Sequence, residues 1–221
     1  MALPWCDVIW RKGSTLLASQ STGLKHRFIQ RRLRRNGLSH ASGISTHMTA
    51  RELCTLYDLS CQAPANARAV EIGSYLGAST CYIVAGLAER GGHLFCVDTW
   101  HNETMPEGTQ DTFGKFQDNL APVINLITVV RKRSDELSGS DIPTGLDFAF
   151  IDGDHDYKAV RQDFDQLAGR ISARGIIAFH DCWWFSGVSR VVGEALSSGR
   201  WVMAGHVENL CWMQRPPDGQ K

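Results

Sequence analysis

The sequence has neither a surplus of one charge nor a long apolar run. Its 23 Lys and Arg residues balance its 23 Asp and Glu residues, and its pI is about 7.1. Proteins that bind nucleic acids commonly carry an excess of positive charge, so this balance gives no sign of a nucleic-acid partner. No stretch of about 18 consecutive apolar residues is present, so we expect no membrane span. The first residues, Met-Ala-Leu-Pro-Trp, lack the basic-then-apolar design of a secretory signal, and we expect no signal peptide.

Paired cysteine motifs are also missing. None of the seven cysteines forms a C-x-x-C pair of the kind that binds zinc or does redox chemistry. Cys81 and Cys96 lie within apolar runs, as small core residues do. We therefore predict reduced thiols and a cytoplasmic protein. The seven are Cys6, Cys54, Cys61, Cys81, Cys96, Cys182 and Cys211.

Apolar residues make up 43% of the 221 residues, which is enough for one α/β domain with a core on both faces of a sheet. The composition changes near Gly43. Before it, the chain is Ser/Gly-rich and basic, with six Lys or Arg residues and one His between residues 25 and 35. We predict a basic helical or extended segment over residues 1–45 and the main domain over residues 46–221. The basic run is typical of a solvated helix face or a mobile arm; the alternative is contact with phosphates or an acidic surface.

Strand and helix patterns alternate through the main domain, after a first helix that begins with a Thr49/Glu52 capping box. We expect parallel strands at Ala69–Ile72, Leu94–Val97, Leu126–Val130, Phe148–Ile151 and Ile176–Phe179. We expect helices at Ala78–Arg90, Gln110–Leu120, Lys158–Arg170 and Val188–Ser197, and a hairpin of Trp201–His206 with Leu210–Gln214. This order predicts a Rossmann-like, doubly wound α/β fold with a mainly parallel seven-stranded sheet and a C-terminal antiparallel hairpin.

The first strand runs into a glycine turn with the spacing E-x-G-x-x-x-G, and ligands of such sheets lie at the carboxyl ends of the strands. Gly73 lets the backbone approach a ligand, and the amides that begin the next helix face the same space. The Glu71 carboxylate would repel a pyrophosphate but suits a ligand that carries an ammonium and a sulfonium. The alternative is a purely structural turn. The predicted cofactor contacts in this turn are Glu71, Gly73, Ser74, Tyr75 and Ser79.

Three further residues follow the second and third strands. Asp98 lies 25 positions after Gly73, where an acidic residue can accept hydrogen bonds from both ribose hydroxyls. Trp100 is placed either to cover a purine ring or to pack in the core. Ser134 either contacts the adenine or caps the next helix. Together with the glycine turn, these residues predict a nucleoside ligand.

The fourth strand is followed by the densest group of ionisable residues, the Asp-Gly-Asp-His-Asp run at 152–156, which would be costly to bury unpaired. Asp152 and Asp181, which ends the fifth strand, are expected to converge and to ligate Mg²⁺ or Mn²⁺. Alternatively, they cap helices or bind the cofactor. His155 is then placed to take the proton of a metal-bound hydroxyl, whereas a loop histidine is more commonly a surface residue. Asp152 and His155 are thus the predicted catalytic residues.

Three segments, residues 71–80, 150–157 and 175–181, resemble class I S-adenosylmethionine-dependent methyltransferases of the macrocin and mycinamicin sugar O-methyltransferase type. The resemblance extends over residues 46–214, and the catechol and caffeoyl-coenzyme A O-methyltransferases are more distantly similar. It implies methyl transfer from S-adenosylmethionine to a hydroxyl, assisted by Mg²⁺.

By the same resemblance, Asp152 and Asp181 match the metal ligands and His155 matches the general base. Glu71, Gly73 and Asp98 match positions that contact the cofactor. The pattern departs at two places. Cys182 stands where the catechol enzymes have Asn, and His180 stands where the sugar enzymes often carry a second acidic residue.

The sequence therefore predicts an S-adenosylmethionine-dependent O-methyltransferase that acts on a hydroxyl of a small molecule, such as a sugar or a natural product. The alternatives are a metal-independent methyltransferase for another nucleophile, an NAD-dependent oxidoreductase and a non-catalytic nucleoside-binding protein. An RNA substrate is disfavoured because the fourth strand lacks the Asn/Asp-Pro-Pro-Tyr/Phe ending used on exocyclic amines. A homo-oligomer is compatible with the sequence. Residues 183–185 either wall the acceptor pocket or pack against the N-terminal segment or a second subunit.

Overall fold

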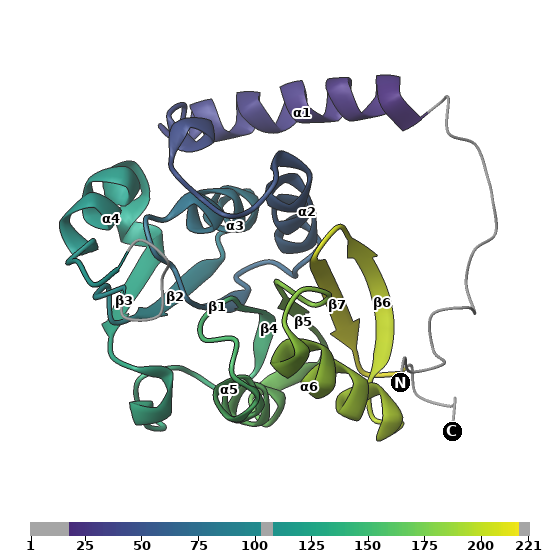
Figure 1. Cartoon of the computed structure of the whole chain (residues 1–221). Coiled ribbons are helices and arrows are strands. Elements are labelled where there is room, and N and C mark those ends of the chain that lie inside the picture. The colour runs from purple at the N-terminus through teal and green to yellow at the C-terminus, as the bar shows by residue number, and fades with distance from the viewer. Residues whose placement is uncertain (1–17, 103–107, 217–221) are drawn as a thin grey trace.

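A seven-stranded sheet forms the centre of the protein, shown here as a computed structural model that describes residues 18–102 and 108–216 (Figure 1). Its strand order is β3-β2-β1-β4-β5-β7-β6. The strands are β1 (Arg68–Ile72), β2 (His93–Asp98), β3 (Ile127–Arg131), β4 (Leu146–Ile151), β5 (Ile171–Phe179), β6 (Val202–Val207) and β7 (Leu210–Gln214). The first five are parallel, and β7 and β6 form an antiparallel hairpin at the edge of the sheet. The predicted fold class is confirmed.

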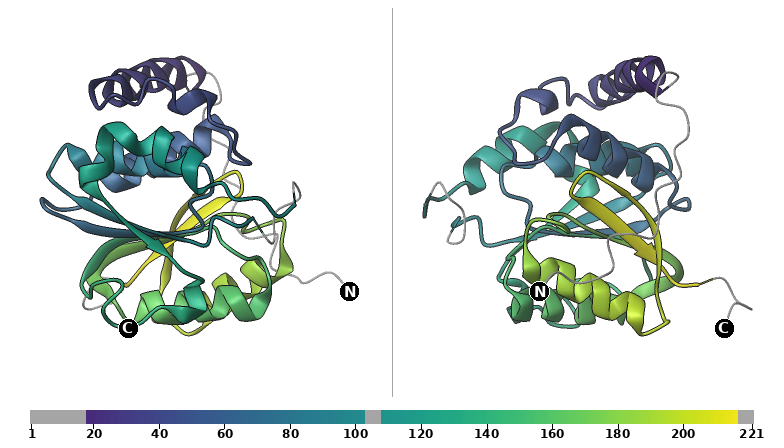
Figure 2. Two further views of the ribbon diagram at one scale, coloured as in Figure 1. Left: turned by 90° about the vertical axis from the view of Figure 1, so that its left-hand side faces the viewer. Right: turned by 45° about the vertical axis from the view of Figure 1, so that its right-hand side comes forward.

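Helices cover both faces of this sheet. They are α1 (Ala18–Arg35), α2 (Ala50–Cys61), α3 (Ala78–Ala88), α4 (Phe113–Leu120), α5 (Tyr157–Ala168) and α6 (Ser186–Ser197). Figure 2 shows α1 to α4 on one face and α5 with α6 on the other. Because side chains alternate along a strand, β4 sends Phe148 and Phe150 into one hydrophobic cluster and Ala149 and Ile151 into the other. Because both faces of the strands are buried, their sequences are nearly continuous runs of apolar residues.

The predicted element boundaries differ most at β5. The apolar pattern predicted a start at Ile176, whereas β5 begins at Ile171 and pairs there with Leu146 of β4. Ala173 and Arg174, in the middle of the added stretch, are exposed, and the register between β4 and β5 shifts near this point. A period-based prediction misses such a stretch, because it has no apolar face to bury.

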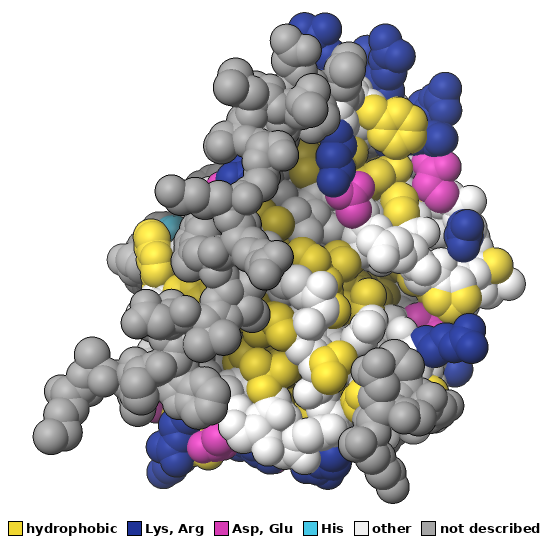
Figure 3. All heavy atoms as spheres, turned by 90° about the vertical axis from the view of Figure 1, so that its right-hand side faces the viewer, with side chains coloured by type: hydrophobic (Ala, Val, Ile, Leu, Met, Phe, Trp, Pro, Cys, Tyr) yellow, Lys and Arg dark blue, Asp and Glu magenta, His cyan; other side chains and the backbone are white. Residues whose placement is uncertain are grey.

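The basic N-terminal run forms the helix α1, which lies over α2 and α3. Ile29 and Leu33 are fully buried in the same cluster as the cores of these helices, whereas Arg27, Arg31 and Arg34 are exposed. Figure 3 shows Lys and Arg side chains gathered at the end of the molecule where α1 lies, at the top of the view. The described part of the run therefore matches the expected solvated helix face. The domain boundary at residue 46 stays a prediction, and residues 1–17 lie outside the described residues.

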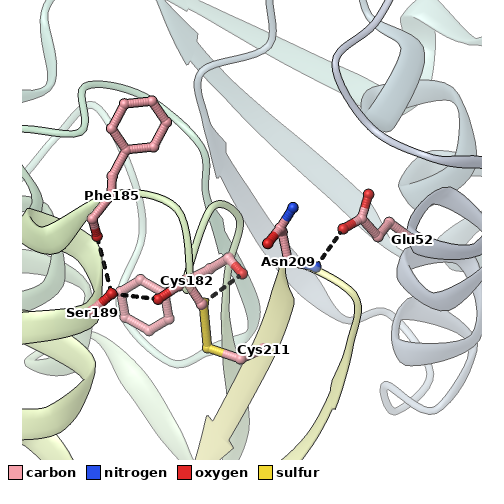
Figure 4. The surroundings of a disulfide bond; sticks show 7 residues. Glu52, Cys182, Phe185, Ser189, Asn209 and Cys211 are labelled. Atoms are coloured by element: carbon pink, nitrogen blue, oxygen red, sulfur yellow. Dashed lines mark hydrogen bonds between the residues drawn. A yellow bond between two sulfur atoms is a disulfide. The ribbon is translucent and has the colours of Figure 1, made fainter. Parts of the chain in front are cut away.

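The prediction that all cysteines are reduced is wrong for one pair. Cys182, just after β5, and Cys211 on β7 form a disulfide (Figure 4). The pairing of β5 with β7 sets Phe179 opposite Cys211, which brings the two cysteines together across 29 residues of sequence. A search for short cysteine motifs cannot find a pair that a hairpin register creates. Cys54, Cys61, Cys81 and Cys96 are free, and Cys6 lies outside the described residues.

Among the described residues, none of the helices has the length and apolar character needed to cross a membrane.

Candidate active site

The carboxyl ends of the parallel strands open into one cavity of about 820 Å³. It lies where the strand order reverses between β1 and β4, which is the usual ligand position in open α/β sheets. The structure brings nine of the predicted site residues into its lining. They are Gly73, Ser74, Tyr75, Ser79, Asp98, Ser134, Asp152, His155 and Asp181. Glu71 and Trp100 do not line the cavity.

The turn after β1 depends on glycine. Gly73 has a φ of +88°, and a Cβ at this position would lie 2.1 Å from the backbone oxygen of Asp152. Only glycine combines this left-handed conformation with such a close approach. The turn is thereby pressed against the end of β4, where the backbone N–H of Asp152 donates to the carbonyl of Ile72 at 2.9 Å. The glycine therefore joins the two halves of the site.

Asp98, at the end of β2, is held by three backbone amides. The N–H groups of Ser74 and Tyr75 donate to its Oδ2 at 2.9 and 2.8 Å, and that of Trp100 donates to its Oδ1 at 2.6 Å. The carboxylate thus has one fixed orientation at the wall of the cavity. An oriented carboxylate can accept further hydrogen bonds from a ligand's hydroxyl groups.

Glu71 lies beneath the turn and is fully buried. Burial raises the pKa of this carboxyl to about 7, although hydrogen bonds from hydroxyl groups oppose the rise. Ser74 donates one of them at 2.8 Å, and Thr80 on α3 donates another. The structure thus gives Glu71 contacts that tie the turn to the helix, rather than a place in the cavity wall.

Trp100 is fully buried, with its ring centroid 5.0 Å from that of Phe113 and 4.7 Å from that of Phe116. This position corresponds to the packing role that the sequence left open. Ser134 is the first residue of a short 3₁₀ helix, Ser134–Glu136, and the residue that caps this helix is Arg133. Ser134 therefore does not act as the cap, and it lies in the cavity wall.

The acidic run after β4 divides into two parts. Asp156 caps α5, because its Oδ2 accepts the backbone N–H of Lys158 at 2.9 Å. Asp152 and His155 instead meet Asp181 from β5, and one ligand atom from each lies within 4.8 Å of the others. The predicted convergence of Asp152, His155 and Asp181 is present in the structure.

His155 and Asp181 form a close pair, with His155 Nε2 3.1 Å from Asp181 Oδ2. The hydrogen bond to Asp181 raises the pKa of His155, because the carboxylate stabilises the imidazolium form. Burial opposes ionisation of Asp181, but hydrogen bonds from His155 and His180 outweigh it and hold the pKa of Asp181 well below its ordinary value. The imidazole is therefore oriented by a charged partner.

His180 and Glu52 complete the cluster. The sequence placed His180 beside Asp181 at this edge but gave it no role, and it gave Glu52 a role only in its helix cap. His180 is buried, with Nδ1 3.3 Å from both Asp152 Oδ1 and Asp181 Oδ2, and with Nε2 3.4 Å from Glu52 Oε2. Burial disfavours the charged imidazole, but the surrounding carboxylates dominate and raise the pKa of His180 strongly. Glu52 also accepts the backbone N–H of Asn209, in the hairpin turn, at 2.8 Å (Figure 4).

The sequence predicted for Glu52 only a capping-box interaction at the start of its helix. The capping box with Thr49 is confirmed, since the Thr49 side chain accepts the N–H of Glu52 and the Glu52 carboxylate accepts the N–H of Thr49 at 2.8 Å. Its contacts with His180 and Asn209 depend on α2 lying against the ends of β5 and β7, which no local pattern reports.

The donor set fits a divalent cation. Carboxylate oxygens of Asp152 and Asp181 are ligands that Mg²⁺ and Mn²⁺ prefer, and such ions are commonly held by one or two carboxylates together with water or substrate oxygens. The imidazole of His155 lies beside the two carboxylates. In its neutral form it has one acceptor nitrogen, so it can bind such an ion or accept a proton, but not both.

Comparisons with known proteins agree with this geometry. A family model described as a methyltransferase domain matches residues 70–182, which is more than half of the chain. Among curated proteins, the uncharacterized protein y4gI of Sinorhizobium fredii is 26% identical over 117 residues, which make up 52% of this chain and 13% of y4gI. The chain thus spans only a small part of that relative's length.

Solved structures show the same fold. The O-methyltransferase NovP has a TM-score of 0.65 at 14% identity, over 78% of this chain and 82% of NovP. The SAH-bound methyltransferase PaMTH1 of Podospora anserina has a TM-score of 0.59 at 12% identity, over 95% and 99%. CalS11, a TDP-rhamnose 3'-O-methyltransferase of calicheamicin biosynthesis, has a TM-score of 0.57 at 11% identity, over 91% and 99%. With a strand-end cavity on this fold and a family model that matches residues 70–182, the chain belongs to the methyltransferase-domain family.

Proposed function

We propose that this protein is a class I S-adenosylmethionine-dependent methyltransferase that moves the methyl group to a hydroxyl of a small molecule, with His155 as general base. The observation that carries the proposal is the His155–Asp181 pair in the wall of the same cavity as the turn after β1. A neutral imidazole beside a carboxylate is suited to removing a hydroxyl proton near neutral pH.

The cavity has two halves, and we assign them different ligands. The ends of β1, β2 and β3 supply the turn at Gly73, the oriented Asp98 carboxylate and Ser134, and these would hold the nucleoside part of the cofactor. The ends of β4 and β5 supply Asp152 and His155, which would face the acceptor.

The proton transfer follows from the orientation of the imidazole. In the tautomer with its proton on Nε2, the atom that lies 3.1 Å from Asp181 Oδ2, the neutral ring presents Nδ1 as its acceptor. The acceptor oxygen attacks the methyl carbon, the carbon–sulfur bond breaks, and the hydroxyl proton goes to Nδ1. S-adenosylhomocysteine and the methyl ether are the products. The protein contributes mainly by holding the oxygen and the methyl group in line.

Asp152 and Asp181 are the residues that would hold a divalent cation, with His155 at its edge. When bound, such an ion lowers the pKa of a hydroxyl that contacts it. A metal-independent reaction at the same base is the alternative, and its support is the buried His180, whose Nδ1 lies 3.3 Å from an oxygen of each of these carboxylates.

Cofactor binding is tested by calorimetry with S-adenosylmethionine. We expect the wild type to bind and the Asp98→Ala variant to bind about 10- to 100-fold more weakly, because hydrogen bonds to a charged group are lost. Asp118→Ala, which removes an exposed carboxylate of α4 outside this cavity, is the matched control and should bind like the wild type. If calorimetry detects no binding of S-adenosylmethionine to the wild type, the proposal is refuted.

The metal is tested with Mn²⁺, whose binding can be followed by electron paramagnetic resonance without turnover. We expect one bound Mn²⁺ per chain and weaker binding in the Asp152→Asn variant, because the amide replaces a charged oxygen ligand. Chelation should lower turnover of the wild type, and Mn²⁺ should restore it. Turnover that is indifferent to chelator, together with no Mn²⁺ signal, would instead establish the metal-independent alternative.

A further inference from the structure

Three consecutive aromatic residues follow the end of β5 without being buried. Trp183 is 53% exposed, Trp184 76% and Phe185 42%. Trp184 and Phe185 line the cavity that contains His155, whereas Trp183 does not and has its ring edge-on to His206, with 6.0 Å between the ring centroids. A large aromatic ring left exposed at the wall of a cavity is a feature of binding sites, because burying it would otherwise stabilise the fold.

The segment that carries these rings is firmly held. The backbone N–H groups of Trp184 and Phe185 both donate to the carbonyl of Asp181 at 3.3 Å. Ser189 Oγ donates to the carbonyls of Cys182 and Phe185, at 2.6 and 3.1 Å (Figure 4). The disulfide from Cys182 to β7 anchors the same turn. A ring bound against this surface would therefore cost little ordering of the protein.

Phe185 connects the aromatic surface to the proposed base. Its ring stacks on the imidazole of His155, with the centroids 4.2 Å apart and the planes inclined by 16°. Trp184 is the next residue and contributes to the same lining. The two aromatic rings therefore lie in the same cavity wall as the proposed base, and the Trp184 ring is the more exposed of the two.

The charges of the cavity limit what that ligand can be. Six carboxylate side chains line it, against one lysine and one arginine and three histidines. Two of the carboxylates, those of Asp152 and Asp181, flank His155 directly. An anionic acceptor would be repelled by this excess of carboxylates, whereas a neutral one would not.

We propose that Trp184 and Phe185 form a stacking platform for the methyl acceptor, and that the acceptor is a neutral hydroxylated ring with a flat apolar face. A phenolic ring and a sugar ring both present such a face. The inference rests on the proposed function, since it identifies the ligand of the platform as the acceptor of the methyl group.

The test compares Trp184→Ala with its matched control Trp183→Ala, which removes an equally large exposed ring outside the cavity. Catechol and methyl β-glucopyranoside are the two ring probes, and 1,2-propanediol is the control without a ring. Binding is measured by saturation-transfer NMR on the full chain, with and without S-adenosylhomocysteine. Methyl transfer is followed with the same three compounds.

We expect at least one ring probe to bind the wild type, and Trp184→Ala to weaken its binding and raise its KM by about tenfold. The kcat, the cofactor affinity and the behaviour of Trp183→Ala should stay near the wild type, and Trp184→Phe should restore most of the loss. Which ring binds distinguishes a phenolic from a sugar acceptor.

Three results would overturn the platform. One is equal binding of the rings and of 1,2-propanediol, and another is an equal effect of the two tryptophan variants. The third is that the wild type sediments as a dimer and Trp184→Ala as a monomer, because the ring would then be buried against a second copy of the chain. Ring binding that persists while S-adenosylmethionine fails to bind would support the platform and refute the proposed transfer, so the two failures are separable.

Discussion

Replacing His155 with alanine is expected to lower turnover about 100- to 10,000-fold, which is the range that general-base catalysis contributes. Affinity for S-adenosylmethionine should stay within about twofold of the wild type, because His155 follows β4, whereas the proposed cofactor half lies at the ends of β1 to β3. Formation of S-adenosylhomocysteine by mass spectrometry gives turnover, and calorimetry gives affinity.

The pH dependence of the wild type supplies a second measurement of the same role. A base must be neutral to accept a proton, and Asp181 raises the pKa of His155 by stabilising its charged form. Turnover should therefore rise with pH through a value above the ordinary 6.5 of histidine, and this limb should be missing in the residual activity of His155→Ala. His101→Ala removes an exposed histidine outside the cavity and should keep both the rate and the profile. A His155→Ala variant with wild-type turnover would exclude the base.

The second large effect is expected on stability. Replacing Glu52 with alanine should lower the free energy of unfolding by about 3 to 5 kcal/mol, the usual consequence of removing one partner of a buried ion pair. Glu52 is buried beside His180, and it also accepts the backbone N–H groups of Thr49 and Asn209. All of these groups would lose a partner. Denaturant unfolding at a pH near 7 measures the change, with an unaltered slope showing that the same surface is exposed on unfolding.

Two variants separate the causes of that loss. Glu52→Gln keeps an oxygen that can accept hydrogen bonds but removes the charge, so it should be less destabilising than Glu52→Ala. Glu89→Ala breaks a partly exposed pair with Arg32 and should cost no more than about 1 kcal/mol. If Glu52→Ala is no less stable than Glu89→Ala, the buried pair does not hold α2 to the ends of β5 and β7.

Much of the fold and half of the site follow from local patterns. Alternating strand and helix signals imply a parallel sheet, and the strands of a parallel sheet all end at one edge. Residues that follow different strands, such as Gly73, Asp98 and Asp152, are therefore predicted to meet, although they are distant in the sequence. The capping box of Thr49 and Glu52 is readable for the same reason, since both partners lie within one helical turn.

Local sequence patterns do not predict the contacts between distant helices and strands. Cys182 meets Cys211 only because β7 pairs with β5 in one register, and Glu52 reaches His180 only because α2 lies against the end of β5. Trp100 follows a strand, like the cavity residues, yet it turns into the core to pack on Phe116. A strand-end position does not specify the direction of its side chain.

The sequence by itself thus determined the sheet, the edge at which the cavity lies and nine of the residues that line it. Those properties depend on the periods of strands and helices and on the backbone freedom of Gly73. Only the tertiary structure decided that Glu71 lies beneath the turn and that His180 lies among three acidic groups. The direction of a side chain at a strand end depends on which neighbours fill the space around it, and those neighbours come from distant parts of the chain.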